Sequence, residues 1–253
     1  MTESPETHPG GRRNRREALQ LLGATALGSL SGRSLPAKEK LTMAKTIVDH
    51  LLLGVADLNQ GIALVKEKTG LSPVIGGSHP GVGTRNALLS LGNLQYLEII
   101  APDPEQQVFT YRPDLGKLQE PRLITWAAAT RDISATAKRA RDAGLEVIGP
   151  QDGSRKKPNG EMLHWKTLGI KNNFTSSGVA PIPFFIQWGE GVQHPSQDEL
   201  TDCRIESLEF VHPESAQVTE MLLKLEIKAK VEPGGEARLT ATLRTPKGSW
   251  FLR

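Results

Sequence analysis

Apolar and polar positions follow one another along this chain in runs that are typical of short β-strands. Residues 47–55 and 94–100 are apolar stretches interrupted by single polar side chains, which favours buried strands. A third stretch, 86–91, precedes the second, and the Gly-Asn pair at 92–93 suits a tight hairpin turn. Ahead of this hairpin, glycines and prolines over 76–83 predict a loop.

A helix is predicted between the first strand and this loop. Leu58, Ile62 and Val65 recur at helical spacing and form one apolar stripe. Asp57 precedes them as a typical N-cap, and Gly70 follows as a typical C-terminal glycine. The helix is therefore expected to begin just after Asp57 and to end just before Gly70.

The same order of elements recurs twice further along the chain. The second copy has a strand at 123–130, a helix that begins after Asp132, and three further strands. The third copy has a strand at 204–210, a helix from about Glu214, and a hairpin over 237–253. This repetition predicts an α+β fold of βαβββ modules, with a related βαββ unit at the C-terminus.

Composition and charge exclude several classes of protein. The formal net charge is +3, but residues 1–37 hold five arginines against three glutamates, so the remainder is close to neutral. This balance gives no electrostatic reason to expect nucleic-acid binding. Cys203 is the only cysteine, which rules out an intramolecular disulfide and a cysteine-rich zinc site.

Residues 1–37 have the features of a signal or disordered leader. Arg-Arg-Asn-Arg-Arg at 12–16 precedes a weakly apolar stretch that is too short to span the roughly 30 Å core of a bilayer. The segment resembles a bacterial twin-arginine signal, which predicts a periplasmic or secreted protein without a stable membrane anchor. Two alternatives are a basic tail and a true start at Met43, which would give a cytoplasmic protein.

His50 and Glu98 are the side chains that suggest chemistry. His50 lies in the first predicted strand and Glu98 in the last strand of the first copy. Imidazole and carboxylate suit Zn²⁺, Mn²⁺, Ni²⁺ or Fe²⁺. A carboxylate among apolar neighbours is also costly to bury without a role. The alternatives are a core histidine bonded to backbone and a glutamate that faces solvent from an edge strand.

Several short motifs together resemble the glyoxalase-like branch of the vicinal oxygen chelate superfamily. The resemblance covers residues 46–195 well and the unit over 203–253 only by pattern. The matching pieces are Val48-Asp49-His50-Leu51, Gly54-Val55-Ala56-Asp57-Leu58, His79-Pro80-Gly81-Val82-Gly83-Thr84-Arg85-Asn86, Tyr96-Leu97-Glu98-Ile99-Ile100, Pro158-Asn159-Gly160 with Trp165, and Trp188-Gly189 with His194-Pro195.

The resemblance implies that the first two modules pair into an incomplete barrel around a cavity, with the third unit packed on it. It also implies a divalent metal (Zn, Ni, Mn or Fe) held by the first and last strands of each module. His50 and Glu98 match the ligand positions of the first module. In the second module those positions fall near Trp126 and near Phe185 or Gln187, so water, His164 or His194 would have to complete the set.

Further residues are candidates for binding a substrate. Arg85 and Asn86 could hold a carboxylate or carbonyl, although an ordinary role at the exit of a turn explains them equally well. Tyr96 shares the strand face of Glu98. Trp126 and Trp188 could stack on an organic ligand, or they could simply pack in the core.

The leading hypothesis is a small-molecule enzyme of the glyoxalase or dioxygenase-like class. A divalent metal would bind neighbouring oxygens of the substrate, or Glu98 would act as a general base. The alternative is a metal-free protein that binds or sequesters a small hydrophobic or aromatic compound. The sequence leaves the substrate, the metal and the oligomeric state open.

Overall fold

The structure, a computed structural model, describes residues 48–157, 159–175, 178–197 and 201–253. These residues belong to one unit of the chain that spans 36–253. The predicted leader over 1–37 and the alternative start at Met43 lie outside the described residues. Within the described ranges, no helix combines the length and the apolar character needed to cross a membrane.

The first module begins with β1 (Val48–Gly54), which is buried along its whole length. Helix α2 (Leu58–Thr69) follows, and β2 (Val74–His79), β3 (Thr84–Ser90) and β4 (Tyr96–Pro102) then pair antiparallel in succession. The last of these strands returns to the side of β1 and runs parallel to it. The first and last strands of the module are therefore neighbours in the sheet.

The second module repeats this arrangement. It consists of β5 (Arg122–Ala129), α3 (Ile133–Asp142), β6 (Val147–Lys156), β7 (Met162–Ile170) and β8 (Phe184–Trp188). Here too the last strand runs parallel to the first. The strand at 146–148 that the pattern predicts is the start of a longer one, because β6 continues to Lys156.

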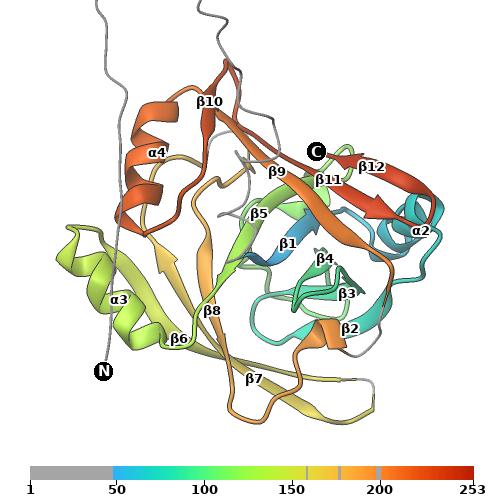
Figure 1. Ribbon diagram of the computed structural model, residues 1–253. Coiled ribbons are helices and arrows are strands. Elements are labelled where there is room, and N and C mark those ends of the chain that lie inside the picture. Colours follow the sequence, from blue (N-terminus) through green and yellow to red (C-terminus); the bar gives the residue numbers. More distant parts are fainter. Residues whose placement is uncertain (1–47, 158, 176–177, 198–200) are drawn as a thin grey trace, which may run out of the picture. The chain divides into compact units, whose positions relative to one another are not determined.

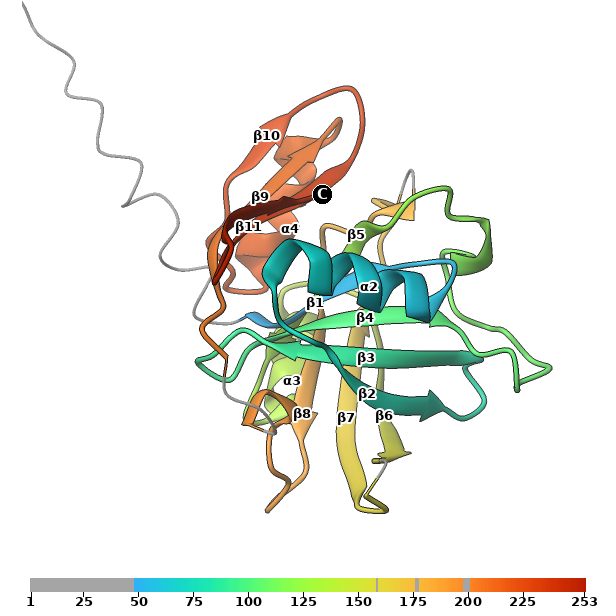
Figure 2. The same cartoon turned by 90° about the vertical axis from the view of Figure 1, so that its right-hand side faces the viewer.

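Antiparallel pairing of β1 with β5 joins the modules into one eight-stranded sheet of order β2-β3-β4-β1-β5-β8-β7-β6 (Figure 1). In Figure 2 the strands of the second module run across the direction of those of the first, because the sheet curls. The two edge strands approach each other, and a guanidinium N–H of Arg155 in β6 donates to the carbonyl of Gly76 in β2. The sheet thus forms the incomplete barrel that the resemblance implies.

The third unit contains β9 (Arg204–His212), α4 (Ser215–Lys224), β10 (Val231–Pro233), β11 (Arg238–Thr245) and β12 (Gly248–Leu252). Its strands form a separate sheet of order β10-β9-β11-β12. The short strand β10 pairs parallel to β9 and is absent from the predicted βαββ unit. The third copy therefore has the βαβββ order of the other two. Short 3₁₀ helices, η1 (Leu115–Lys117) and η3 (Pro195–Gln197), lie in the connections.

A shared apolar core joins the two sheets. Trp126 of β5 is fully buried, and its indole lies 5.8 Å from the ring of Phe210 in β9. Leu51 and Leu53 of β1 belong to the same cluster, as does Leu208 of β9. Side chains on the convex side of the curled sheet therefore pack in this core. Candidate functional side chains are expected on the concave side.

Both helices of the curled sheet begin where the sequence predicts, and α2 also ends at the predicted glycine. Asp57 Oδ1 accepts from the Gln60 amide at 2.9 Å, and Asp132 Oδ1 accepts from the Ala135 amide at the same distance. Gly70 ends α2 with φ of 78°, a left-handed conformation that glycine adopts without a steric penalty. The N-cap predictions are confirmed.

The predicted loop over 76–83 is wrong at its start, and a basic segment of the kind that usually indicates a solvated loop belongs to a strand. Residues 76–79, which glycine content assigns to a loop, belong to β2, and a register shift between Ile75 and Gly77 places a bulge there. The basic segment that begins at Arg155 is also part of a strand. Arg155 is only 4% exposed because its side chain turns inward between the two sheet edges.

Candidate functional site

The concave side of the curled sheet encloses a cavity of about 840 Å³. Strands of both modules line it. One part of its wall is polar, with His50, Asn86 and Glu98 of the first module. The second module contributes two indoles, Trp165 and Trp188, together with polar side chains such as Arg155. This volume is in the range of roughly 300–1,000 Å³ that small-molecule sites in proteins have.

A bulge in β1 brings Asp49 and His50 together. Val48 pairs with Ala128 and His50 with Ala127, so Asp49 is an extra residue opposite the partner strand. The strict alternation of a regular strand would separate the two side chains. Instead, His50 Nδ1 lies 2.7 Å from Asp49 Oδ1, and both residues are 2% exposed.

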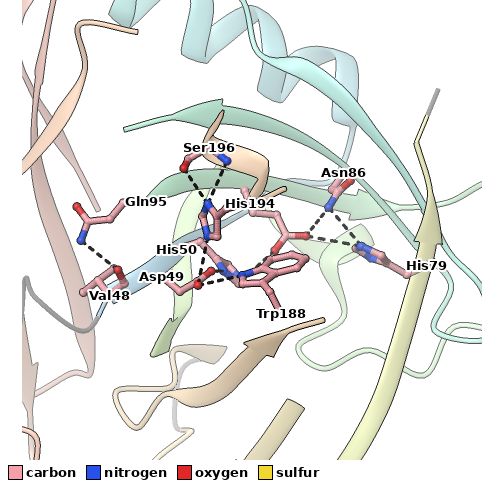
Figure 3. Close-up of polar contacts among 10 residues, drawn as sticks. Val48, Asp49, His50, His79, Asn86, Gln95, Trp188, His194 and Ser196 are labelled. Atoms are coloured by element: carbon pink, nitrogen blue, oxygen red, sulfur yellow. Dashed lines mark hydrogen bonds and ion pairs between the residues drawn. The ribbon is translucent and has the colours of Figure 1, made fainter. Parts of the chain in front are cut away.

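Two further groups hold the other oxygen of Asp49 (Figure 3). The indole N–H of Trp188 donates to Asp49 Oδ2 at 3.1 Å, and His194 Nε2 lies 3.3 Å from the same oxygen. The Ser196 amide donates to His194 Nδ1 at 3.2 Å, so the proton of His194 resides on Nε2 and points to Asp49. The carboxylate of Asp49 is thus bonded at both oxygens.

These contacts determine the charge of Asp49. Burial by itself raises the pKa of this carboxyl, but the hydrogen bonds and charges of His194 and His50 outweigh burial and lower the pKa to about 2. Asp49 is therefore ionised at neutral pH and accepts the Nδ1–H of His50. The lone pair or second proton of His50 is confined to Nε2, on the cavity side.

Glu98 faces His50 across the polar part of the cavity. Its Oε2 lies 3.4 Å from His50 Nε2, and its Oε1 accepts from Asn86 Nδ2 at 2.7 Å. Glu98 is 6% exposed, so its charge is held by these contacts and not by bulk water. An imidazole nitrogen that carries hydrogen can donate to a carboxylate oxygen in this position.

His79 extends this network from the end of β2. The amide nitrogen of Asn86 lies 3.2 Å from His79 Nε2, and because an amide –NH₂ can only donate, Nε2 is the acceptor. His79 Nδ1 then donates to Thr84 Oγ1 at 2.8 Å. Burial lowers the pKa of His79, and the charge of Glu98 opposes this only in part. His79 is therefore a neutral partner of Asn86 (Figure 3).

Gly76 allows this arrangement to form. A Cβ at position 76 would overlap Asn86 Oδ1, an atom that has no hydrogen-bond partner. The carbonyl of the same glycine accepts from Arg155. The bulge of β2 thus places the backbone of Gly76 against the side-chain amide of Asn86, which donates to Glu98.

Aromatic rings enclose the His50 imidazole. Tyr96 stacks on it with centroids 4.5 Å apart, and Phe184 approaches it edge-on at 5.6 Å. Burial, together with the charges of Asp49 and Glu98, raises the pKa of Tyr96 well above its usual value, so the phenol stays neutral. The imidazole can neither rotate nor move away from Glu98 without displacing a ring.

The structure brings only part of the predicted residues to this cavity. Asn86, Tyr96 and Trp188 line it together with His50 and Glu98. Four other predicted residues lie elsewhere. Arg85 points to the opposite face of β3 near Asp103, Trp126 is in the core, His164 is exposed on the outer face of β7, and His194 lies behind His50 against Asp49.

The second module shows why its predicted ligand positions are wrong. Trp126 and Phe185 point into the core, and Gln187 accepts from the Ile133 amide at the start of α3. The neighbouring residues face the cavity instead, and these are Thr125, Phe184, Ile186 and Trp188. In these strands the residues that face the cavity are therefore one position away from those expected to face it.

These residues do not fit the metal that the resemblance implies. His50 Nε2 and Glu98 Oε2, at 3.4 Å, have the separation of two ligands on one ion, given metal–ligand distances of about 2.0–2.2 Å. Of the described residues that line the cavity from the second module, Asp152 has a carboxylate, but this side chain is 85% exposed and lies 3.2 Å from Lys166 Nζ. On the first module, Asn86 donates to His79 Nε2. In the described ranges, no three His, Cys, Asp or Glu side chains are grouped so as to hold a metal.

Asp49 and Arg155 are the residues of the site whose position the sequence does not predict. Asp49 adjoins a predicted ligand, but the alternation rule assigns it to the opposite face of β1. A polar pair inside a strand that is otherwise apolar is the one signal that could have suggested a bulge. Arg155 lies in a run of basic residues, which ordinarily indicates a solvated loop.

A curled sheet of two βαβββ modules around a cavity defines the class of protein, that of the vicinal oxygen chelate fold. The model of the Glyoxalase-like domain family matches residues 48–226, and the chain belongs to this family. No curated protein sequence matches the chain.

Two solved structures are similar to the chain at low sequence identity, and the first of them shows the same fold. A hypothetical protein from Staphylococcus aureus is 19% identical with a TM-score of 0.59, over 76% of this chain and 87% of that one. A methylmalonyl-CoA epimerase from Mycobacterium tuberculosis is 21% identical with a TM-score of 0.38, over 58% of this chain and 89% of that one.

Proposed function

We propose that the cavity is the active site of an enzyme that removes and returns a proton at a carbon next to a carbonyl group. The observation that carries this proposal is the contact between Glu98 and His50. A buried carboxylate, oriented by Asn86, lies 3.4 Å from the cavity-side nitrogen of an imidazole that an ionised aspartate holds in place. A base and a hydrogen-bond donor to oxygen are thus presented side by side.

The spacing of these groups suits an enolisation. With standard bond lengths, a carbonyl oxygen and the adjacent carbon lie about 2.4 Å apart. Glu98 accepts the proton from that carbon, the C–H electron pair forms a C=C bond, and the carbonyl π pair moves to oxygen. His50 Nε2–H donates to this oxygen. Return of the proton from Glu98 to either face of the carbon, or to a neighbouring atom, completes the reaction.

Asp49 and Asn86 act through these two groups. The negative charge of Asp49 stabilises a proton on His50, and its position selects the Nε2 side for the substrate. Asn86 orients the Glu98 carboxylate by donating to Oε1, which leaves Oε2 directed toward His50. The reaction class is therefore isomerisation by way of an enolate.

A divalent metal, if the protein uses one, would be held on the protein side by His50 and Glu98 alone. Its chemistry would be that of a Lewis acid for neighbouring substrate oxygens. Because the proposed proton transfer uses only the side chains of Glu98 and His50, we expect activity to survive dialysis against a chelator. Metal analysis of protein purified without chelator, followed by an assay of the stripped protein, tests this expectation.

The enzyme proposal is tested by hydrogen exchange. A panel of ketones, aldehydes and 2-oxo acids in D₂O is followed by NMR for loss of the hydrogen next to the carbonyl. Glu98→Gln should slow exchange by about 10²–10⁴-fold, the usual contribution of a general base. The fold should persist because a glutamine oxygen can still accept from Asn86.

The matched control is Glu67→Gln, since Glu67 lies exposed on α2 and lines no cavity. Equal exchange by wild type and Glu98→Gln would contradict the proposal. Tight binding of a panel compound without any exchange would favour the alternative of a binding or sequestration protein.

Export by a twin-arginine-like leader also remains a proposal. Intact mass spectrometry of the mature protein tests it. An N-terminus near residue 38 in a periplasmic or secreted fraction would support export, and a cytoplasmic protein that begins at Met43 would contradict it.

A further inference from the structure

Aromatic residues are concentrated around the cavity. The chain has four tryptophans, two tyrosines and six phenylalanines, which make up only 5% of its residues. Both tyrosines and two of the tryptophans line the cavity, together with one phenylalanine. In a chain so poor in aromatic residues, this distribution separates the cavity wall from the core, which is built mainly from aliphatic side chains.

These rings differ in whether they contact the polar network around His50. Tyr96 and Phe184 pack against the His50 imidazole, and Trp188 donates to Asp49. Their positions are explained by the polar network. Trp165 makes no hydrogen bond to that network, and its closest ring neighbours are Trp188 at 5.7 Å and His79 at 6.4 Å. Another explanation is needed for its position.

Trp165 lies against the backbone of the neighbouring strand. Its cross-strand partner in β6 is Gly153, and a Cβ at that glycine would overlap the pyrrole part of the indole. The same indole is partly exposed and lines the cavity. Glycine at position 153 thus leaves room for a large planar side chain that a ligand in the cavity can contact.

The size of the cavity argues in the same direction. A substrate of three or four carbon atoms would fill a small fraction of about 840 Å³ and leave water around Glu98 and His50. An active site that stabilises a charge works best when water is excluded. A larger substrate with an apolar body would cover the aliphatic residues of the wall, such as Leu52, Ile100 and Ile186.

We infer that the substrate is an aryl-substituted carbonyl compound whose ring stacks on Trp165 while its carbonyl group lies between His50 and Glu98. This inference rests on the proposed function for the carbonyl end of the substrate. It adds that the other end of the substrate is an aryl ring. A planar ring gains stacking energy on an indole, beyond what burial of equal apolar area provides.

Three ketones of graded structure test the inference with the full chain. Binding of 4-phenylbutan-2-one, 4-cyclohexylbutan-2-one and butan-2-one is measured by calorimetry, and exchange in D₂O is measured on the same samples. We expect the phenyl compound to bind about fivefold or more tightly than the cyclohexyl compound, because only the planar ring stacks. Butan-2-one should bind the weakest.

Trp165→Leu should bring the two ring compounds to about equal affinity, because leucine offers apolar area but no planar surface. The matched control is Trp250→Leu on β12, outside the cavity, which should leave the phenyl preference unchanged. The preference of the wild-type protein is informative even if a variant fails to fold.

The two proposals fail in different ways. If the cyclohexyl compound binds as tightly as the phenyl compound to the wild-type protein, the aryl inference is wrong, whatever exchange is seen. If the phenyl preference is present and disappears in Trp165→Leu, but none of the ketones exchanges, the aryl inference holds and the proposed proton transfer is wrong. Glu98→Gln should retain the phenyl preference and lose exchange.

Discussion

The two modules of the curled sheet share one architecture and contribute different chemistry to the cavity. In each, a first strand, a helix capped by aspartate and a parallel last strand recur in the same order. The first module supplies the titratable groups, Asp49, His50 and Glu98. On the second, the positions next to the joint between the modules carry Thr125 and Phe184.

This difference shows which properties the scaffold imposes. Pairing of β1 with β5 forces the first strands of both modules to the centre of the sheet, so each contributes residues to one cavity. The scaffold does not require that both contribute the same chemistry. One module can keep the network of Asp49, His50 and Glu98, while the other lines the same cavity with different side chains, two indoles among them. The predictions below test that division of tasks.

The largest effect is expected from Asp49→Asn in the first module. An asparagine cannot supply the negative charge that holds the His50 proton on Nδ1, so the imidazole loses its orientation. We expect exchange of the substrate hydrogen next to the carbonyl group to slow by about a hundredfold or more. A variant with wild-type exchange rates would show that His50 needs no negatively charged partner.

The same substitution should alter the pH dependence of stability. The pKa of Asp49 is about 2 in the folded protein, against an ordinary value of 3.8. Because the folded pKa is lowered, Asp49 stabilises the protein above about pH 4, and this stabilisation is lost as the pH falls through 2. It amounts to about 2 kcal/mol. Urea unfolding should show the gap between wild type and variant narrowing by this amount from pH 5 to pH 2.

A smaller effect is expected from Gly76→Ala, also in the first module. The added methyl group overlaps Asn86 Oδ1, so Asn86 must shift away from Glu98. Exchange should fall by about tenfold, the equivalent of about 1.4 kcal/mol and close to the value of a hydrogen bond to a charged group.

Gly235→Ala is the matched control for this variant, since a Cβ at that position meets no atom within 4 Å. It should leave the exchange rate unchanged. An equal loss of rate in both glycine variants would mean that a general destabilisation, and not the position of Asn86, explains the result.

Local signals in the sequence are sufficient for most of the scaffold. The caps at Asp57 and Asp132 and the terminal glycine of α2 determine where the helices begin and end, and these depend on neighbours within a few positions. Membership of the family follows from several short motifs taken together. The prediction of a loop around Gly76 is wrong because glycine usually marks a loop. Here it lies in β2 and leaves room for a side chain from the next strand.

The site is less predictable because it depends on irregularities of the sheet. The register shift between Val48 and His50 reverses the expected direction of Asp49. Trp126 is the cross-strand partner of Leu51, a core residue, and it falls on the core side as well. A one-residue difference reverses every side chain of a strand, and alternation of apolar residues cannot reveal it when both faces are buried.

The smallest effects are expected from the helix caps, and they test the common scaffold without its chemistry. Asp57→Ala and Asp132→Ala each remove a bond of 2.9 Å to a backbone amide in the first turn of α2 or α3. Each should lower the free energy of unfolding by about 1 kcal/mol, measured by urea denaturation. Neither residue lines the cavity, so exchange rates and the phenyl preference should stay at wild-type values. A loss of exchange in one cap variant but not in the other would show that its helix influences the cavity, and that the two modules differ in mechanics as well as in chemistry.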